Sequence, residues 1–315
     1  MIQRRILGLV FSKDRALQLE ACLDSCALHA TEAAAVRMVV VYGASSARFL
    51  GQYEALARWH SGTARFVPDR QFRSRVLEVL RSSAARGPDA QGSGIIGRLW
   101  QKARLRTPPP GMPAECVLFL VDDTLFVGPF DLAAAQSALH ANPDALGFSL
   151  RLGRNTIRSY VHDRRQELPR FQEAGEGILK YDWTQADGDF GYPLEVSSSL
   201  YRLSDVLRLV SGLSFKDPNT LESQMAIRAP RFSQGQPSML CSDNSVAFSA
   251  PINRVQDVYE NRVGANPALS TGSLADTFDR GLRIDVAALD GFVPSACHQE
   301  VEFSFEPRPA RQTVK

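Results

Sequence analysis

Short apolar runs alternate with amphipathic segments along the first half of the chain. Residues 6–11, 36–42 and 116–121 are nearly all apolar, which is typical of strands buried on both faces of a sheet. A shorter strand is predicted at 64–67, and helical spacing of apolar residues predicts helices at 16–30, 49–60 and 72–85. This alternation predicts an α/β fold with a mostly parallel, doubly wound sheet and helices on both faces.

The second half is less regular. Helices are predicted at 131–142, 203–212 and 221–229, the last with Asn219 or Thr220 as its N-cap. Strands are predicted at 146–152, 196–202, 246–250 and 298–305, and residues 274–280 form either a helix or a loop. Residues 153–195 are polar and aromatic with little periodicity.

The buried strand at 116–121 ends in two adjacent acids, Asp122 and Asp123. Ligands of open α/β sheets bind outside the carboxyl ends of the strands, and two carboxylates there suit Mg²⁺ or Mn²⁺ that carries a phosphate. The alternative is that these acids only stop the strand or cap the following helix. The sequence Asp-Asp-Thr-Leu-Phe also resembles the start of a haloacid-dehalogenase-type phosphatase, but Leu120 stands where that family has its nucleophile.

Composition narrows the class of protein. The chain has 315 residues, is 44% hydrophobic and 22% charged, and carries a net charge of +2, which suits a globular protein and gives no global field for nucleic acid. No apolar run approaches the ~20 residues of a membrane span or a signal peptide, so a cytoplasmic protein is expected, with peripheral attachment to the inner membrane surface left open. The five scattered cysteines are interpreted as reduced thiols of the core.

Several segments, in order along most of the chain, resemble bacterial family-2-like glycosyltransferases with a GT-A fold. They are Val10-Phe-Ser-Lys-Asp-Arg15, the acid-ended strand at 117–123, Pro218-Asn-Thr-Leu-Glu222, residues 253–257, and His298 with Glu300. In that family an Asp-x-Asp motif holds a metal on the nucleotide-sugar diphosphate. Here Asp123 matches the last acid and Val121 replaces the first.

The resemblance implies roles for individual residues. Asp122, Asp123 and His298 would hold the metal, and Phe11, Ser12, Lys13, Arg15, Tyr42 and Asp122 would contact the nucleotide sugar. Glu222 would be the general base that deprotonates the acceptor hydroxyl. The alternatives are a surface position for His298 and a capping-box position for Glu222.

The acceptor side has further candidates. Asp187, Asp189 and Glu195 compete with Glu222 as the base. Tyr181, Trp183 and Tyr192 are either platforms for an acceptor sugar or ordinary packing residues. The usual acid at the end of the second strand is absent, so the nucleotide is left open.

We therefore expect a metal-dependent, inverting glycosyltransferase that uses a nucleoside-diphosphate sugar and a glycan or lipid-linked acceptor in cell-surface glycan synthesis. Residues 1–305 would form one GT-A-like domain, with a donor half to about residue 130, and 306–315 a flexible tail. One alternative is a nucleotidyl or phosphoryl transferase, although residues 12–15 contain no glycine-rich phosphate loop. The other is a non-catalytic binding or scaffold subunit, which Val121 favours slightly.

Overall fold

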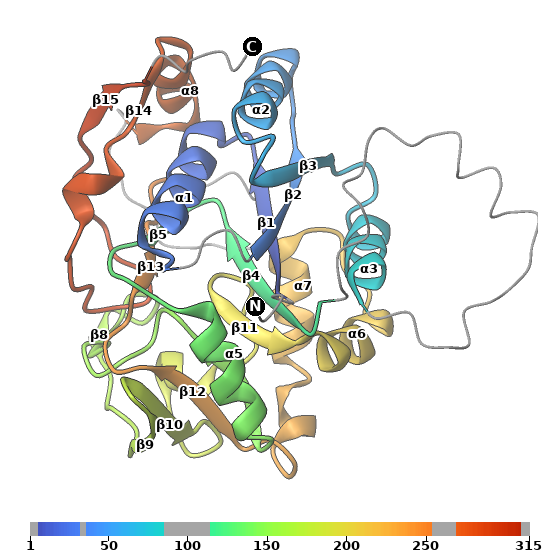
Figure 1. The fold of residues 1–315 in the computed structure, drawn as a ribbon, viewed down its shortest axis with the longest axis vertical. Coiled ribbons are helices and arrows are strands. Elements are labelled where there is room, and N and C mark those ends of the chain that lie inside the picture. The colour runs from blue at the N-terminus through green and yellow to red at the C-terminus, as the bar shows by residue number, and fades with distance from the viewer. Residues whose placement is uncertain (1–5, 32–35, 85–113, 254–268, 310–315) are drawn as a thin grey trace, which may run out of the picture.

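A nine-stranded mixed sheet forms the centre of the molecule (Figure 1). The computed structural model describes residues 6–31, 36–84, 114–253 and 269–309. The strand order is β3-β2-β1-β4-β11-β6-β12-β10-β9, and β11 and β10 run against the other seven strands. The strands are β1 (Ile6–Lys13), β2 (Val36–Gly43), β3 (Ala64–Pro68), β4 (Cys116–Val121), β6 (Ala145–Ser149), β9 (Gln172–Gly175), β10 (Ile178–Asp182), β11 (Ser199–Arg202) and β12 (Ser238–Ser242).

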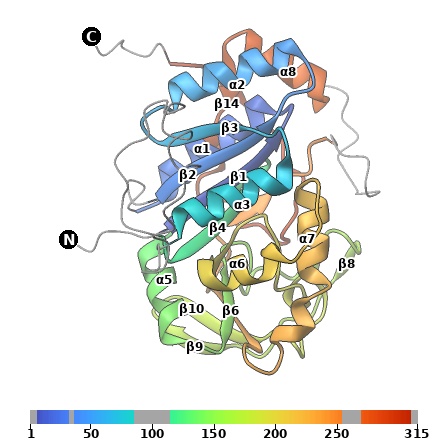
Figure 2. The ribbon, with the colours of Figure 1, turned by 90° about the vertical axis from the view of Figure 1, so that its right-hand side faces the viewer.

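Helices cover both faces of this sheet. One face carries α1 (Ala16–His29), α2 (Ala47–Trp59), α5 (Leu132–Ala141) and α8 (Thr271–Asp279). The other carries α3 (Phe72–Ser83), α6 (Leu203–Ser211) and α7 (Pro218–Ala226), which lie together in Figure 2. Short two-stranded pairs join β13 (Ala247–Ser249) to β5 (Thr124–Phe126), β14 (Leu282–Ile284) to β15 (Phe305–Pro307), and β7 (Arg158–Ser159) to β8 (Arg164–Arg165).

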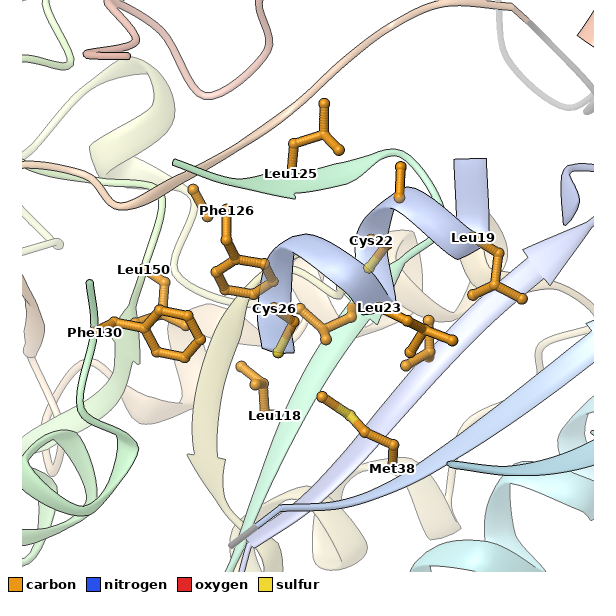
Figure 3. Packing of buried hydrophobic residues seen from close by; sticks show 14 of the residues in the cluster. Leu19, Cys22, Leu23, Cys26, Met38, Leu118, Leu125, Phe126, Phe130 and Leu150 are labelled. Atoms are coloured by element: carbon orange, nitrogen blue, oxygen red, sulfur yellow. The ribbon is translucent and has the colours of Figure 1, made fainter. Parts of the chain in front are cut away.

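Each face of the sheet has its own hydrophobic core, because successive side chains of a strand point to opposite faces. On β4, Leu118 and Leu120 pack beneath α1 with Cys22 and Cys26 (Figure 3). The alternate residues, such as Phe119, pack against the other core beneath α3 and α6. Two-sided burial explains the nearly continuous apolar runs of β1, β2 and β4.

Most of the predicted elements are confirmed. The α/β class, the doubly wound sheet and the helices on both faces are as expected, and residues 274–280 lie mainly in α8. Three strands of the central sheet were not predicted: β9 and β10 in the segment 153–195, and β12. The short strands β5, β7, β8 and β14, which lie outside that sheet, were not predicted either.

Two predictions near the carboxyl end are wrong. The strand predicted at 298–305 is not formed, because His298 makes only an isolated bridge to Ser249 and the strand β15 begins at Phe305. Residues 306–308 do not belong to a flexible tail, because Arg308 donates two hydrogen bonds of 2.7 Å to Glu20 and stacks over Trp59.

The described residues also bear on thiol chemistry and on membranes. All five cysteines are buried free thiols. Within the described ranges, no helix is both long enough and apolar enough to cross a bilayer.

The close approach of β6 and β11 gives a test of the fold. A Cβ atom at Gly147 would lie 2.6 Å from Cε1 of the buried Tyr201 on β11. We expect Gly147→Ala to lower the free energy of unfolding by about 1–3 kcal/mol through overpacking, measured by chemical denaturation. Gly51 in α2 has open space around it, so Gly51→Ala should instead raise stability by up to about 1 kcal/mol. Equal stability of the two variants would contradict this packing.

Candidate active site

The candidate site lies at the carboxyl ends of β1 and β4. These strands pair in parallel with Phe11 opposite Val121, so the residues that follow each strand become neighbours. The backbone N–H of Asp122 donates to the carbonyl of Phe11 at 3.0 Å, and the N–H of Lys13 donates to Oδ2 of Asp122 at 3.3 Å. The sheet register thus brings the Ser-Lys-Asp-Arg loop and the adjacent acids together.

Arg15 links these acids to a distant part of the chain. Its Nη1 lies 3.1 Å from Oδ1 of Asp122 and 3.5 Å from Oδ2 of Asp123. Its Nε donates to the side chain of Asn253 at 2.9 Å, and its Nη2 donates to the Asn253 carbonyl. Asn253 is the one described residue of the 253–257 motif. Arg15 therefore connects the Ser-Lys-Asp-Arg loop, the paired acids and the first residue of the 253–257 motif.

Tyr53 on α2 and Ser45 after β2 hold the Ser-Lys-Asp-Arg loop of residues 12–15. The Tyr53 hydroxyl contacts Oγ of Ser12 at 2.6 Å and accepts from the backbone N–H of Arg15 at 3.1 Å. Asp14 has a left-handed backbone with φ of 56°, which Asp tolerates better than most residues, and its Oδ1 accepts from the N–H of Ser45 at 2.7 Å. The loop is thus fixed before any ligand binds.

The side chains predicted to contact the nucleotide differ in their surroundings. Phe11 is 2% exposed and packs against the rings of Phe72 and Phe119, so it belongs to the core. Tyr42 is 9% exposed and stacks on Tyr53 with 4.6 Å between ring centroids. Lys13 is the exposed cation of the loop.

Asp122 and Asp123 are not equivalent. Asp122 is buried and already accepts from Lys13 and Arg15. Burial raises its pKa, while Arg15 opposes that rise. Asp123 has a side chain that is 21% exposed, and among the described side chains its ion-pair contact is the 3.5 Å one to Arg15. Burial raises the pKa of Asp123 to about 6. Asp123 is therefore the open carboxylate of the pair.

The carboxylates of Asp122 and Asp123 fit a metal ion that binds together with a phosphate group. Among the described residues, no three His, Cys, Asp or Glu side chains gather as a metal site, so Asp122, Asp123 and His298 do not form one ligand cluster. Mg²⁺ in phosphate sites commonly takes one or two protein carboxylates and completes its shell with phosphates and water. Asp123 can supply such a carboxylate.

His298 is held near the same region by its backbone. Ser249 bridges to His298, and the next residue, Ala250, donates its N–H to the carbonyl of Asp123 at 2.8 Å. Nδ1 of His298 is buried without a hydrogen-bond partner among the described residues. Burial, and then the charge of Arg151, lower the pKa of His298 to about 3, so the ring is neutral at physiological pH.

Glu222 lies on α7, but it does not take the capping-box position that was its alternative assignment. The N-cap of α7 is Asp217, which forms a capping box with Thr220, so the predicted caps at Asn219 and Thr220 and a capping role for Glu222 are wrong. Pro218 at the first helical position explains the earlier start of the helix. Glu222 is freed from the helix end and accepts instead from the N–H of Val196 at 2.9 Å and from the Tyr192 hydroxyl at 3.5 Å.

The environment of Glu222 favours its protonated form. Burial and then repulsion from Glu195 raise its pKa, Arg151 opposes both effects, and the pKa lies at about 7. A carboxyl group with a pKa near 7 is suited to accept a proton from a bound hydroxyl at neutral pH. Glu222 is thus chemically competent as a general base.

The three competing carboxylates have other partners. Asp187 is exposed and pairs with Arg164 at 2.8 Å, and a backbone hydrogen bond from Gly188, with the Arg164 contacts, lowers its pKa. Asp189 accepts from Gln166 at 3.2 Å, and burial raises its pKa. Glu195 is buried against Arg151.

The three aromatic candidates divide in the same way. Tyr181 and Trp183 are 2% and 7% exposed and lie in the core, as their packing alternative predicted. Tyr192 is 38% exposed and stands beside Glu222.

Arg151 was missed by the sequence reasoning. It follows β6, is 7% exposed, and places Nη2 3.3 Å from Oε2 of Glu195. Its charge also acts on the pKa values of Asp123, Asp189 and Glu222. The available signal was an arginine inside the otherwise apolar run 146–152, where an unpaired charge would be costly.

Comparison with known proteins agrees with the resemblance to glycosyltransferases. No known family profile matches the chain. The bifunctional glycosyltransferase pgtA of Dictyostelium discoideum is 31% identical over an alignment of 171 residues that covers 47% of this chain and 22% of that protein. The chain thus corresponds to only about a fifth of the relative's length. This similarity confirms the resemblance to glycosyltransferases, while its bacterial and family-2 aspects stay predictions.

Two solved structures are similar at low identity. TarS of S. aureus is 12% identical with a TM-score of 0.44, over 78% of this chain and 36% of TarS. The mannosyltransferase PcManGT from Pyrobaculum calidifontis, in complex with GDP-Man and Mn²⁺, is 16% identical with a TM-score of 0.41, over 75% of this chain and 54% of that one.

The raised pKa of Glu222 predicts a pH-dependent stability that needs no substrate to measure. Because the folded-state pKa of about 7 exceeds the ordinary glutamate value of 4.5, the contribution of Glu222 to stability is complete below pH 4.5 and is lost as pH rises through 7. We expect Glu222→Gln to gain stability relative to wild type between pH 5 and pH 8, by about 3 kcal/mol at most. Chemical denaturation across this range is the measurement, with the exposed Glu173→Gln as background. A difference that does not change with pH would contradict the buried setting of Glu222.

Proposed function

We propose that the protein is a glycosyltransferase that moves a sugar from a nucleoside diphosphate to an acceptor hydroxyl, with inversion, in the synthesis of a cell-surface glycan. The observation that supports the proposal is that the charge of Arg151 acts on both Asp123, the partly exposed acid after β4, and Glu222, whose pKa is raised to about 7. The hydroxyl of Thr124, next to Asp123, also donates at 2.7 Å to the carbonyl of Ser197, two residues from Glu195. The relationship to a glycosyltransferase over 171 residues supports the same reaction class.

The proposed organisation is one GT-A-like domain, which extends past residue 305 because β15 and Arg308 pack on the rest of the fold. The half to about residue 130 would bind the nucleotide sugar, and residues 131–305 would bind the acceptor. This division matches the chemistry of the two groups of residues, since the cations and the open acid follow β1 and β4 and Glu222 and Tyr192 lie later in the chain. A glycan or lipid-linked acceptor at the inner face of the membrane is part of the proposal.

On the donor side, Lys13 and Arg15 would contact the diphosphate, and Asp123 would hold Mn²⁺ or Mg²⁺ together with it. A bound divalent metal would neutralise charge that grows on the departing diphosphate. Arg15 is an always-charged fork donor, so it suits phosphate oxygens as well as the carboxylates that it now contacts. Asp122 would hold Arg15 and the loop in place, because its own oxygens are already engaged.

On the acceptor side, Glu222 would remove the proton from the attacking hydroxyl. The backbone N–H of Val196 holds one carboxyl oxygen, which leaves the other oxygen, beside the Tyr192 hydroxyl, for the acceptor. The exposed ring of Tyr192 offers an apolar face on which a sugar can pack. Direct attack assisted by one base gives inversion at the anomeric carbon.

Metal-dependent donor binding should depend on Asp123. We expect one nucleoside diphosphate, from a panel tested with Mn²⁺, Mg²⁺ or chelator, to raise the Tm only when metal is present. A ligand at 100 times its Kd adds about 2.7 kcal/mol of stability. Asp123→Asn should abolish this shift, whereas Asp187→Asn, a change of an exposed acid, should keep it. No shift with any nucleotide would favour the non-catalytic scaffold instead.

The base assignment separates transfer from donor binding. We expect Glu222→Gln to keep the nucleotide-dependent Tm shift while sugar transfer falls by about 10²-fold or more, as for loss of a general base. The measurement is product formation with the donor identified by the thermal panel. Turnover within a few-fold of wild type would move the base to another residue, with Asp189 tested next by Asp189→Asn.

A further inference from the structure

The pairing of Arg151 with Glu195 is a buried ion pair beside Glu222 for which the proposed reaction has no direct use. Glu195 is 3% exposed and Arg151 is 7% exposed. Nη2 of Arg151 contacts Oε2 of Glu195 at 3.3 Å, and Nη1 is buried without a partner among the described residues. Burying two charges costs several kcal/mol per ion unless each finds good partners. Apolar side chains would fill this space at less cost, which indicates a role of the pair beyond packing.

The Glu195 carboxylate accepts hydrogen bonds from the backbone that follows it in the chain. The N–H groups of Ser197 and Ser198 both donate to it, with Ser198 at 3.2 Å from Oε2. The N–H of Val196, inside the same turn of residues 195–198, points away from Glu195 and donates to Oε2 of Glu222 at 2.9 Å. The orientation of this N–H group therefore depends on where the Glu195 carboxylate is held.

We propose that Arg151 is a positioning residue for the base: by fixing Glu195 it fixes the turn 195–198, which presents the Val196 N–H group to Glu222. Arg151 also supplies the positive charge that balances the acids of this region. The inference rests on the proposed role of Glu222, but the arrangement itself is a property of the protein without substrate.

Charged and titratable groups from several parts of the chain act on this assembly. They are Asp123 after β4, Asp189 in the short helix Gly188–Gly191, Tyr192 and Glu195 before β11, Tyr201 on β11, Glu222 on α7, and Cys297 and His298 near the carboxyl end. Arg151 lowers the pKa of Glu222 and Glu195 raises it, each after the larger effect of burial. Loss of Arg151 should therefore raise the pKa of Glu222, and loss of the Glu195 charge should lower it.

The test is the titration of Glu222 in the substrate-free protein. Glutamate labelled with ¹³C at its side-chain carboxyl carbon is followed by NMR against pH, and the signal that Glu222→Gln lacks assigns Glu222. In Arg151→Met we expect the Glu222 midpoint to rise by about one unit or more, because a neighbouring opposite charge is lost. In Glu195→Gln we expect it to fall, because the repulsion is removed and Arg151 is free to turn to Glu222.

The two directions distinguish positioning from general loosening of the fold. A loosened site would expose Glu222 to water and lower its pKa toward its ordinary value in both variants, and that result would overturn the proposal, as would an unchanged midpoint in Arg151→Met. If Arg151→Met does not fold, Arg151→Gln removes the charge but can still donate to Glu195, and the same rise is expected. Arg154→Gln is the matched control, since Arg154 is an exposed arginine paired with Glu173 and Asp243.

The titration does not depend on sugar transfer, so the two ideas can fail separately. A raised Glu222 midpoint in a protein that transfers no sugar would keep the role of Arg151 and remove the proposed function. If transfer is found, the acid limb of its pH–rate profile should move upward in Arg151→Met in step with the NMR midpoint.

Discussion

Two arginines, the buried Arg151 and the largely covered Arg15, make it possible to gather acids at the carboxyl edge of the sheet. Arg15 contacts Asp122 and Asp123, and Arg151 contacts Glu195. A buried carboxylate without a partner is strongly destabilising, so each acid depends on an arginine or on backbone N–H groups. These pairs join the loop after β1, the end of β4, the loop after β6 and the turn before β11. The residues of the candidate site therefore also stabilise the fold in this region.

The same arrangement gives the acids different surroundings. Burial raises the pKa of both Asp123 and Glu222. The Asp123 side chain is 21% exposed and can face a cation, while Glu222 is held by the Val196 N–H group and the Tyr192 hydroxyl. Acids in different environments can take different roles in one reaction. Asp122 and Glu195 are bound by internal donors and serve to hold the others in place.

The sequence was informative where burial was two-sided and periodic. The strands β1, β2 and β4 and the helix α1 follow their apolar patterns closely, and the acids after β4 were found because a buried run ends there. β9 was missed because it is the edge strand and three of its four residues are exposed, which leaves no apolar signal. β10 lies next to it and has only two buried side chains, Leu179 and Tyr181, separated by a lysine. The contacts of Glu222 join residues 26 positions apart, and no local pattern encodes them. Arg151 carried a signal, a charge in an apolar run, but its partner could not be read from it.

Val121 shows how the donor side differs from the motif that it resembles. Val121 pairs with Phe11 at the end of β4 and packs against the hydrophobic core beneath α3 and α6. An acid there would face apolar side chains, whereas Asp123, two residues on, lies past the end of the strand and is partly exposed. With Asp122 occupied by Lys13 and Arg15, a metal at this edge would have one open protein carboxylate and would need phosphate oxygens to complete its shell. Metal and nucleotide would then bind as one unit, with Arg15 beside them to share the negative charge of the diphosphate.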